Sequence, residues 1–234
     1  MFSNFRKRSA HPPQAVEEVL PKVNENLVDV GGELNVASLL AGYRMGAFPW
    51  TVNPVTWWSP DPRAIIEFES FHASRSLLRL LRKEPFHLTI DAAFDEVIRL
   101  CARSGPRRRT TWITPEFISA YTDMHREGHA HSLEVWQYER LVGGIYGVAI
   151  GSYFAGESMF HLVPNASKAA LFYLVQHLRT QEFTLLDIQM PTRITLQMGA
   201  SLIPRREFLG RLRAAQQRSV TFGNAVHTQP VHDD

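Results

Sequence analysis

The sequence predicts an α+β protein with a small N-terminal domain, residues 1–62, and a larger domain, residues 63–234. Segments whose apolar residues recur with helical spacing are interspersed with short apolar runs typical of strands. Two of those runs, joined by a short turn at 138–140, indicate a hairpin, and a later helix is flanked by two strands. The stretch 51–64, rich in Pro and Trp, breaks the helical pattern near the domain boundary. We therefore expect a mixed sheet flanked by helices.

One helix of the N-terminal domain has clear start and stop signals. Residues 1–26 look irregular, apart from a short helix at 14–19. Asn35 suits the N-cap of the next helix, and Gly46 suits its C-terminal end. The stretch 51–64 is then interpreted as a structured linker.

The larger domain mixes strands and helices. Thr114 as a cap, Pro115 at the first helical position and Gly128 at the end delimit one helix, and Asn165 suits the cap of another. The tail after Arg218 is expected to be frayed. Strands are expected at 64–70, 86–90, 131–137, 141–156 and 183–190. Helices are expected at 72–84, 92–103, 113–128, 165–181, 192–200 and 204–217.

The composition is that of a globular protein. Of 234 residues, 44% are hydrophobic and 21% are charged, which is enough for one substantial core or two modest ones. A single cysteine excludes a disulfide framework and is compatible with a reducing cytosol. No apolar run approaches the roughly 20 residues that span a bilayer, and no apolar segment follows the basic N-terminus. The sequence thus gives no sign of membrane contact.

Basic and aromatic residues suggest an anionic partner. The helix at 72–84 places Arg75, Arg79 and Arg82 on one face and leucines on the other. Trp112 directly follows an arginine-rich loop, and aromatic faces beside guanidinium groups can stack the bases of single-stranded nucleic acid. A solvated basic face and core tryptophans are the alternative interpretation, and the net charge of +2 does not decide between them.

Several common sites are absent from the sequence. His129 and His131 could share a strand face, but no third metal ligand is placed beside them. The chain has no phosphate-binding Gly-Lys-Ser/Thr loop, no GxGxxG fingerprint and no GxSxG nucleophile elbow. Cys101 lies within a helical pattern and is interpreted as a structural thiol.

The strand FTLLDIQM, residues 183–190, carries two polar groups within an apolar run. Because side chains alternate along a strand, Asp187 and Gln189 share one face with Leu185. Burying an unpartnered polar group costs about 2–7 kcal/mol. The pair is therefore hydrogen-bonded within the fold, or exposed in a cleft and used. Glu157, between a glycine and an apolar pair, raises the same question.

A set of strings in a fixed order then adds a resemblance. WWSPDPRAI, TWIT, GHAHSLEVW, LVGGIYGVAIG, GESMF, NASK and IPRREFL together resemble bacterial leucyl/phenylalanyl-tRNA–protein transferase, from about Val30 to Leu212. The resemblance implies an enzyme that moves leucine or phenylalanine from aminoacyl-tRNA to proteins whose N-terminal residue is Lys or Arg. Such a transfer creates a destabilising N-terminus for the N-degron pathway.

The resemblance also implies an acetyltransferase-like (GNAT) fold for residues 63–234, a cytoplasmic location and no cofactor. We expect a monomer. The implied catalytic residues are Asp187, Gln189 and Glu157, and the implied partners of the terminal adenine are Trp50 and Trp112. The implied aminoacyl pocket consists of Ile145, Phe154, Met159, Leu171, Leu174, Leu178 and Leu186.

Two of these pocket positions depart from the family, because Leu174 and Leu178 stand where phenylalanine is expected. The preference among Leu, Phe and Met is therefore left open. The basic helix, with Arg75, Arg79, Arg82 and Lys83, is the expected contact for the tRNA acceptor stem through its phosphates.

The ester of an aminoacyl-tRNA is already activated, so no enzyme nucleophile is required. The Gln189 carbonyl oxygen can accept a hydrogen bond from the attacking amine, while Asp187 holds the geometry. Whether Glu157 meets the acceptor amine or its basic side chain stays open. Two other functions fit the same residues: a non-catalytic tRNA-binding module, and an acyl-CoA-dependent acyltransferase, although the usual pyrophosphate loop of the latter is missing.

Overall fold

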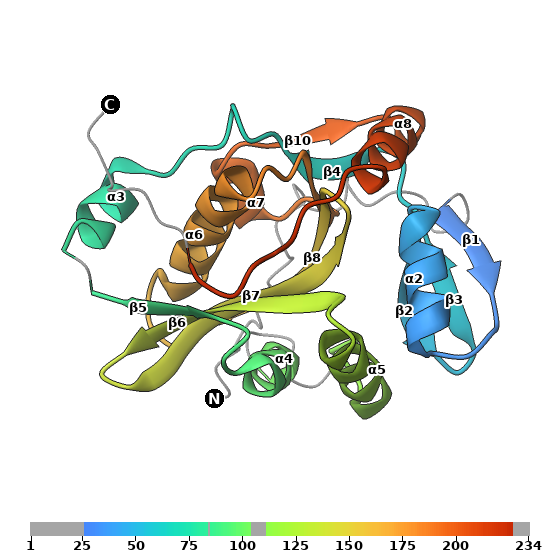
Figure 1. Ribbon diagram of the computed structural model, residues 1–234. Coiled ribbons are helices and arrows are strands. Elements are labelled where there is room, and N and C mark those ends of the chain that lie inside the picture. The colour runs from blue at the N-terminus through green and yellow to red at the C-terminus, as the bar shows by residue number, and fades with distance from the viewer. Residues whose placement is uncertain (1–25, 84, 104–110, 227–234) are drawn as a thin grey trace, which may run out of the picture.

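A computed structural model describes residues 26–83, 85–103 and 111–226. The N-terminal region forms a three-stranded antiparallel sheet in the order β1-β3-β2, and α2 contacts β2 (Figure 1). Asn35 caps α2, since its side chain accepts a hydrogen bond from the Ser38 N–H at 2.9 Å. The elements are β1 (Leu27–Val30), α2 (Val36–Arg44), β2 (Phe48–Val52) and β3 (Val55–Trp58).

The second sheet has seven strands in the order β10-β4-β9-β8-β7-β6-β5. All of its neighbours are antiparallel except β8 and β9, which are joined by α6 (Ala166–Thr180) in a parallel crossover. The strands are β4 (Arg63–Ile66), β5 (His87–Ile90), β6 (Ala130–Gln137), β7 (Arg140–Ile150), β8 (Tyr153–His161), β9 (Leu185–Gln189) and β10 (Ala200–Ile203).

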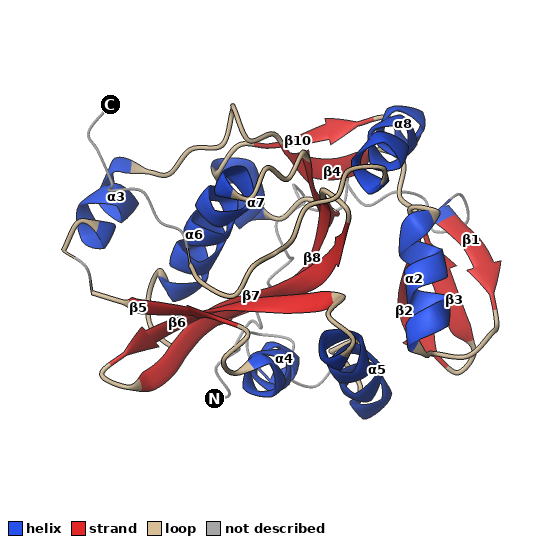
Figure 2. Cartoon of the chain, in the orientation of Figure 1, coloured by secondary structure: helices blue, strands red, loops and turns tan. Residues whose placement is uncertain are grey.

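Helices cover both faces of this sheet (Figure 2). On one face, α3 (Arg75–Leu81) packs against α6, and both belong to one hydrophobic cluster. On the other face, α4 (Phe94–Arg103), α5 (Pro115–Arg126) and α8 (Arg205–Gln216) contribute, together with α2, to a second cluster. The short α7 (Arg193–Gln197) precedes β10. The predicted α+β class, with a small N-terminal region and a mixed sheet flanked by helices, is confirmed.

Three local predictions are wrong. The expected linker at 51–64 contains the end of β2 and all of β3, which pair as a hairpin, and residues 55–58 alternate between buried and partly exposed. The expected single strand at 141–156 is β7 and part of β8, because Gly151 turns the chain with φ +58. The segment predicted as helix at 192–200 ends at Gln197 and is followed by β10, a strand that the pattern did not reveal.

The tail after Arg218 is also more ordered than expected, since Phe222 is only 3% exposed. The helix predicted at 14–19 lies outside the described residues, as does most of the arginine-rich loop before Trp112. Within the described ranges, no helix is long and apolar enough to cross a membrane.

Candidate active site

Glu157 and Gln189 lie where the parallel strands β8 and β9 part. The pairing of these strands ends at Ala155 and Asp187, although β8 continues to residue 161 and β9 to residue 189. Just beyond that point, each strand carries a β-bulge toward its other neighbour. Bulges of this kind re-aim side chains and are common next to active sites.

In β8, the bulge leaves Glu157 without a cross-strand partner, because Tyr146 pairs with Ser158 and Gly147 with Gly156. A side chain at Gly147 would collide with the backbone of Ala155, so the strands can approach here only with glycine at this position.

In β9, Gln189 adopts a left-handed conformation with φ +54. This conformation is uncommon for residues other than glycine and costs on the order of 1 kcal/mol or more. The backbone N–H of Gln189 is held by Asp187 Oδ1 at 2.9 Å, which stabilises the bulge. Asp187 therefore fixes the backbone position of Gln189.

The carboxylate of Asp187 is fully buried and fully occupied. Besides the Gln189 N–H, it accepts hydrogen bonds from Arg63 Nε at 2.8 Å, Arg63 Nη2 at 2.7 Å and the Tyr153 hydroxyl at 2.8 Å. A carboxylate offers about four lone-pair positions, and all of them are used here. Asp187 therefore has no free position for a substrate amine, and all of its hydrogen-bond partners belong to the protein.

Arg63 is a partner that the sequence interpretation missed. It is 0% exposed, its Nη1 donates to the Gly46 carbonyl oxygen at 3.0 Å, and its guanidinium lies 4.4 Å from the centre of the Phe208 ring. The available signal was an arginine directly before the apolar residues Ala64 and Ile65, because a buried arginine requires a buried carboxylate.

A chain of hydrogen bonds links Gln189 to the N-terminal region. Gln189 Nε2 donates to Glu157 Oε1 at 2.8 Å, and the Tyr121 hydroxyl donates to Glu157 Oε2 at 3.3 Å. The Tyr121 hydroxyl is in turn hydrogen-bonded to that of Tyr43, on α2. No hydrogen bond among the described residues uses the side-chain carbonyl oxygen of Gln189, Oε1. That atom can therefore accept a hydrogen bond from a substrate. The two tyrosines also escaped the sequence interpretation.

The network sets the protonation of Glu157. Burial raises its pKa to about 7, and the nearby Asp187 charge acts in the same direction. The hydroxyls of Tyr43 and Tyr121 and the charge of Arg63 act against this rise. Burial and the charge of Glu157 raise the pKa values of both tyrosines well above the usual value, so their hydroxyls stay protonated. Glu157, which is partly exposed, can thus take up or release a proton near neutral pH.

Trp50 and Trp112 come together beside this network. Their rings stack with centroids 5.9 Å apart and planes inclined by 14°. Both line a cavity of about 570 Å³, together with Cys101 and Ser158. The cavity has the size of a small-ligand site, and it reaches within one residue of Glu157 through Ser158, although Asp187 and Gln189 do not line it. Burial raises the pKa of the Cys101 thiol to about 12, which fits a structural thiol.

The predicted aminoacyl residues form one apolar group on the α6 side of the sheet. All belong to the same hydrophobic cluster, and each is at most 5% exposed except Met159, which is only partly buried. Met159 lies on the part of β8 that β9 no longer covers. The group consists of Ile145, Phe154, Met159, Leu171, Leu174, Leu178 and Leu186.

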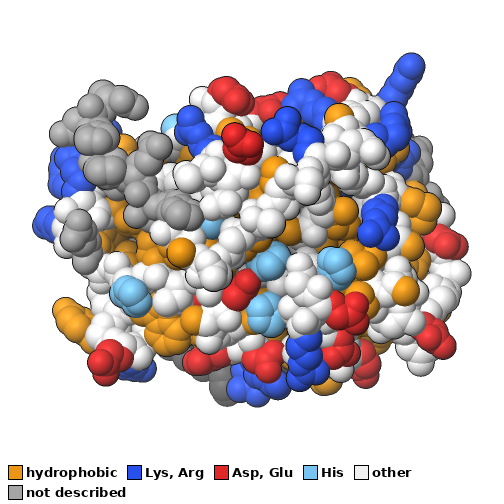
Figure 3. Space-filling model, viewed as in Figure 1, with side chains coloured by type: hydrophobic (Ala, Val, Ile, Leu, Met, Phe, Trp, Pro, Cys, Tyr) orange, Lys and Arg blue, Asp and Glu red, His pale blue; other side chains and the backbone are white. Residues whose placement is uncertain are grey.

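The basic residues of α3 face solvent. Arg75, Arg79, Arg82 and Lys83 are exposed, while Leu77 and Leu81 are buried, as the helical spacing predicts. Figure 3 shows this basic group at the left edge of the molecule and a second group over α8 at the top.

The two groups differ in their partners. No ion pair among the described residues involves Arg75 or Arg79, whereas Arg211 of α8 pairs with Glu67 and Glu207. Among the residues that the structure describes, no three His, Cys, Asp or Glu side chains are arranged to hold a metal ion.

Comparisons with known proteins identify the family. A family model described as leucyl/phenylalanyl-tRNA protein transferase matches residues 65–213, and the model of its N-terminal domain matches residues 32–61. The chain belongs to this family. The resemblance in the sequence is thereby confirmed, and the protein is an aminoacyltransferase.

Relatives named leucyl/phenylalanyl-tRNA–protein transferase cover most of the chain. The protein of Shewanella denitrificans is 46% identical over 204 residues, covering 84% of this chain and 87% of its own. That of Syntrophotalea carbinolica is 49% identical over 193 residues, covering 81% and 84%. That of Legionella pneumophila is 46% identical over 202 residues, covering 86% and 90%. The solved structure of L-PGS from Bacillus licheniformis matches 76% of this chain and 62% of that chain at 13% identity, with a TM-score of 0.41.

Proposed function

We propose that this aminoacyltransferase moves leucine or phenylalanine from aminoacyl-tRNA to the N-terminal α-amine of proteins that begin with Lys or Arg. The product then enters N-degron degradation in the cytoplasm, and the enzyme acts as a monomer without a cofactor. The larger domain, residues 63–234, is assigned an acetyltransferase-like (GNAT) fold. Family membership supports the reaction class, and the resemblance of the sequence motifs supports the acceptor specificity and the location.

The observation that carries the proposal is the position of Gln189 and Glu157. Both side chains emerge at bulges where β8 and β9 part, they hydrogen-bond to each other at 2.8 Å, and the cavity of Trp50 and Trp112 begins one residue away. A donor held by its terminal base in that cavity can thus bring its ester close to an amide and a titratable carboxylate.

In the reaction, the acceptor nitrogen attacks the ester carbonyl carbon, the N–C bond forms, and the bond to the ribose oxygen breaks. The Gln189 carbonyl oxygen accepts a hydrogen bond from the amine and orients it. Gln is too weak a base to remove the proton. Glu157, with a pKa of about 7, is matched to an α-amine of pKa near 8 and can hold that proton until the ribose oxygen takes it. Asp187 acts indirectly, through the backbone of Gln189.

The donor is held in three places. The terminal adenine stacks against Trp50 and Trp112, whose rings stack on each other with centroids 5.9 Å apart, so the two rings must separate to admit a base between them. The aminoacyl side chain enters the apolar group around Phe154. The acceptor stem lies against Arg75, Arg79, Arg82 and Lys83, which contact its phosphates.

The test is a transfer assay with radiolabelled Leu-tRNA and a peptide that begins with Arg. Label on the peptide is the expected result, and the same peptide with an acetylated N-terminus is the matched control that stays unlabelled. Retention of Leu-tRNA without transfer would instead indicate a tRNA-binding module. Acylation that depends on acetyl-CoA would indicate an acyl-CoA-dependent acyltransferase.

A further inference from the structure

The segment after α8 crosses the sheet on the same face as α6. This segment, residues 219–226, is called the C-terminal strap here, and Figure 1 shows it in red as it runs from α8 past β8 and β7 beside α6. His177, on α6, donates a hydrogen bond from Nε2 to the Phe222 carbonyl oxygen at 2.6 Å. The strap lies beyond residue 213, where the match to the family model ends.

The Phe222 ring is inserted into the hydrophobic cluster that contains the proposed aminoacyl residues. It is 3% exposed and stacks on Phe154, with centroids 5.3 Å apart and planes inclined by 20°. Phe183 meets it edge to face at 6.2 Å, and the His131 ring stacks on it at 4.5 Å. Phe154 is itself one of the proposed aminoacyl residues, so Phe222 adds a wall to that group from outside the sheet.

The position of Phe222 relative to the reacting groups gives this wall a role. Gln189 is the last residue of β9, and Glu157 lies in the middle of β8, just beyond the point where the two strands part. Phe222 instead contacts Phe154, near the start of β8, and Phe183, which precedes β9. The ring therefore closes the apolar group at the end farthest from the reacting centre, where the tip of an aminoacyl side chain would reach.

We infer that Phe222 is a specificity-determining residue, which sets the depth of the pocket for the side chain of the donor amino acid. The inference rests on the proposed function, because it requires that the group around Phe154 receives the aminoacyl side chain. A shorter residue at position 222 should favour the longer phenylalanyl side chain over the leucyl side chain.

The experiment measures kcat/KM for Phe-tRNA and for Leu-tRNA with Phe222→Leu, using one acceptor peptide. The Phe-to-Leu ratio should rise about tenfold, the lower end of the discrimination that one methylene gives in an apolar pocket. The KM of the acceptor peptide should not change. The matched control is Phe172→Leu, since Phe172 is 7% exposed in the same cluster but its ring contacts Phe71 and Tyr173 instead. The ratio should not change in this control.

An unchanged ratio in Phe222→Leu, or a change that the Phe172→Leu control reproduces, would overturn the inference. If Phe222→Leu does not fold, Phe222→Met is measured by the same criterion. Failure of the proposed function would look different, because the wild-type protein would then transfer neither amino acid.

Discussion

Replacing Arg63 with methionine should destabilise the protein by about 3–5 kcal/mol, the usual cost of removing one partner from a buried ion pair. The guanidinium donates to both oxygens of Asp187, at 2.8 and 2.7 Å, and to the Gly46 carbonyl oxygen at 3.0 Å. Without it, a carboxylate with no exposure retains only the Tyr153 hydroxyl and the Gln189 N–H as donors. Because domains are stable by only about 5–15 kcal/mol, the variant should lose a large part of its stability.

The double variant Arg63→Met with Asp187→Leu separates stability from function. Replacing both members of a buried pair by apolar residues is often nearly neutral, so the stability should return to within roughly 2 kcal/mol of the wild type. Transfer should nevertheless be lost in the double variant. The Gln189 backbone N–H no longer has the Asp187 oxygen that holds its left-handed conformation.

The assay is urea denaturation, in which the midpoint is compared at equal slope, together with transfer from Leu-tRNA to an Arg peptide. A loss of under about 1 kcal/mol in the single variant would contradict a buried, paired Arg63. A double variant that transfers at the wild-type rate would contradict the role given to Asp187.

Three further changes test other parts of the site. Burial raises the pKa of Glu157 to about 7, so this carboxyl keeps its proton in the folded protein over a range, from about pH 4.5 to 7, in which the unfolded chain has lost it. Wild-type stability should therefore fall as pH rises through this window. At pH 8, Glu157→Gln should be more stable than the wild type by roughly 1–3 kcal/mol, while transferring more slowly. Stability curves of the two proteins that run parallel from pH 4 to 8 would rule this out. Trp112→Ala should weaken binding of intact tRNA by about 1–3 kcal/mol, whereas tRNA without its terminal adenosine should bind both proteins alike in a filter assay. Arg75→Glu with Arg79→Glu should lower the slope of log affinity against log salt by about 2, and the control Arg213→Glu, on α8, should leave it unchanged; equal slopes in all three proteins would move the tRNA surface elsewhere.

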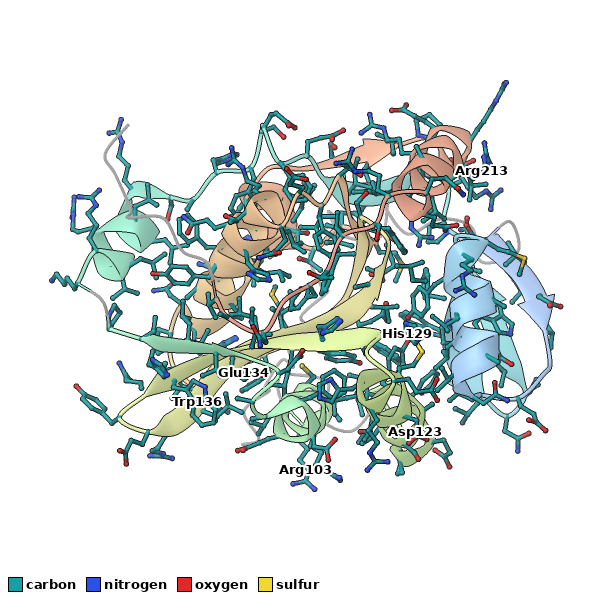
Figure 4. The ribbon with its side chains drawn as sticks, viewed as in Figure 1. Arg103, Asp123, His129, Glu134, Trp136 and Arg213 are labelled. Carbon is teal, nitrogen blue, oxygen red and sulfur yellow. The ribbon has the colours of Figure 1, made fainter. Side chains whose placement is uncertain are left out.

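The control position is well separated from α3. Arg213, labelled on α8 in Figure 4, points away from the body of the protein and is exposed, as is Arg103, labelled on α4. An effect of Arg213→Glu equal to that of the α3 changes would indicate a general effect of charge and not a local contact with the acceptor stem.

Periodicity predicted most of the fold because the signals are local. The helical spacing of leucines in α3 and the cap Asn35 of α2 depend on neighbours within one turn, and the structure contains these helices. The β2–β3 hairpin and β10 were missed because their pairing partners are distant or because proline obscured the strand pattern. β10, for example, pairs with β4, more than 130 residues earlier.

In the candidate site, too, local features could be predicted from the sequence and distant contacts could not. The position of Asp187 and Gln189 on one strand follows from residue type and alternation. The partners of these residues could not be predicted in this way. Arg63 is 124 positions away from Asp187, and the hydrogen bonds from Glu157 through Tyr121 to Tyr43 join three separate elements. The two bulges are likewise set by strand pairing, and they lie beside the hydrogen bond of 2.8 Å between Gln189 Nε2 and Glu157 Oε1.

The most direct test of the whole account is the single-turnover rate of transfer by Gln189→Ala, measured with saturating Leu-tRNA and an Arg peptide. The Gln189 carbonyl oxygen is assigned the task of orienting the amine. The rate should therefore fall by about 10²-fold or more, while the affinity for Leu-tRNA stays at the wild-type value. A rate close to that of the wild type would contradict the account.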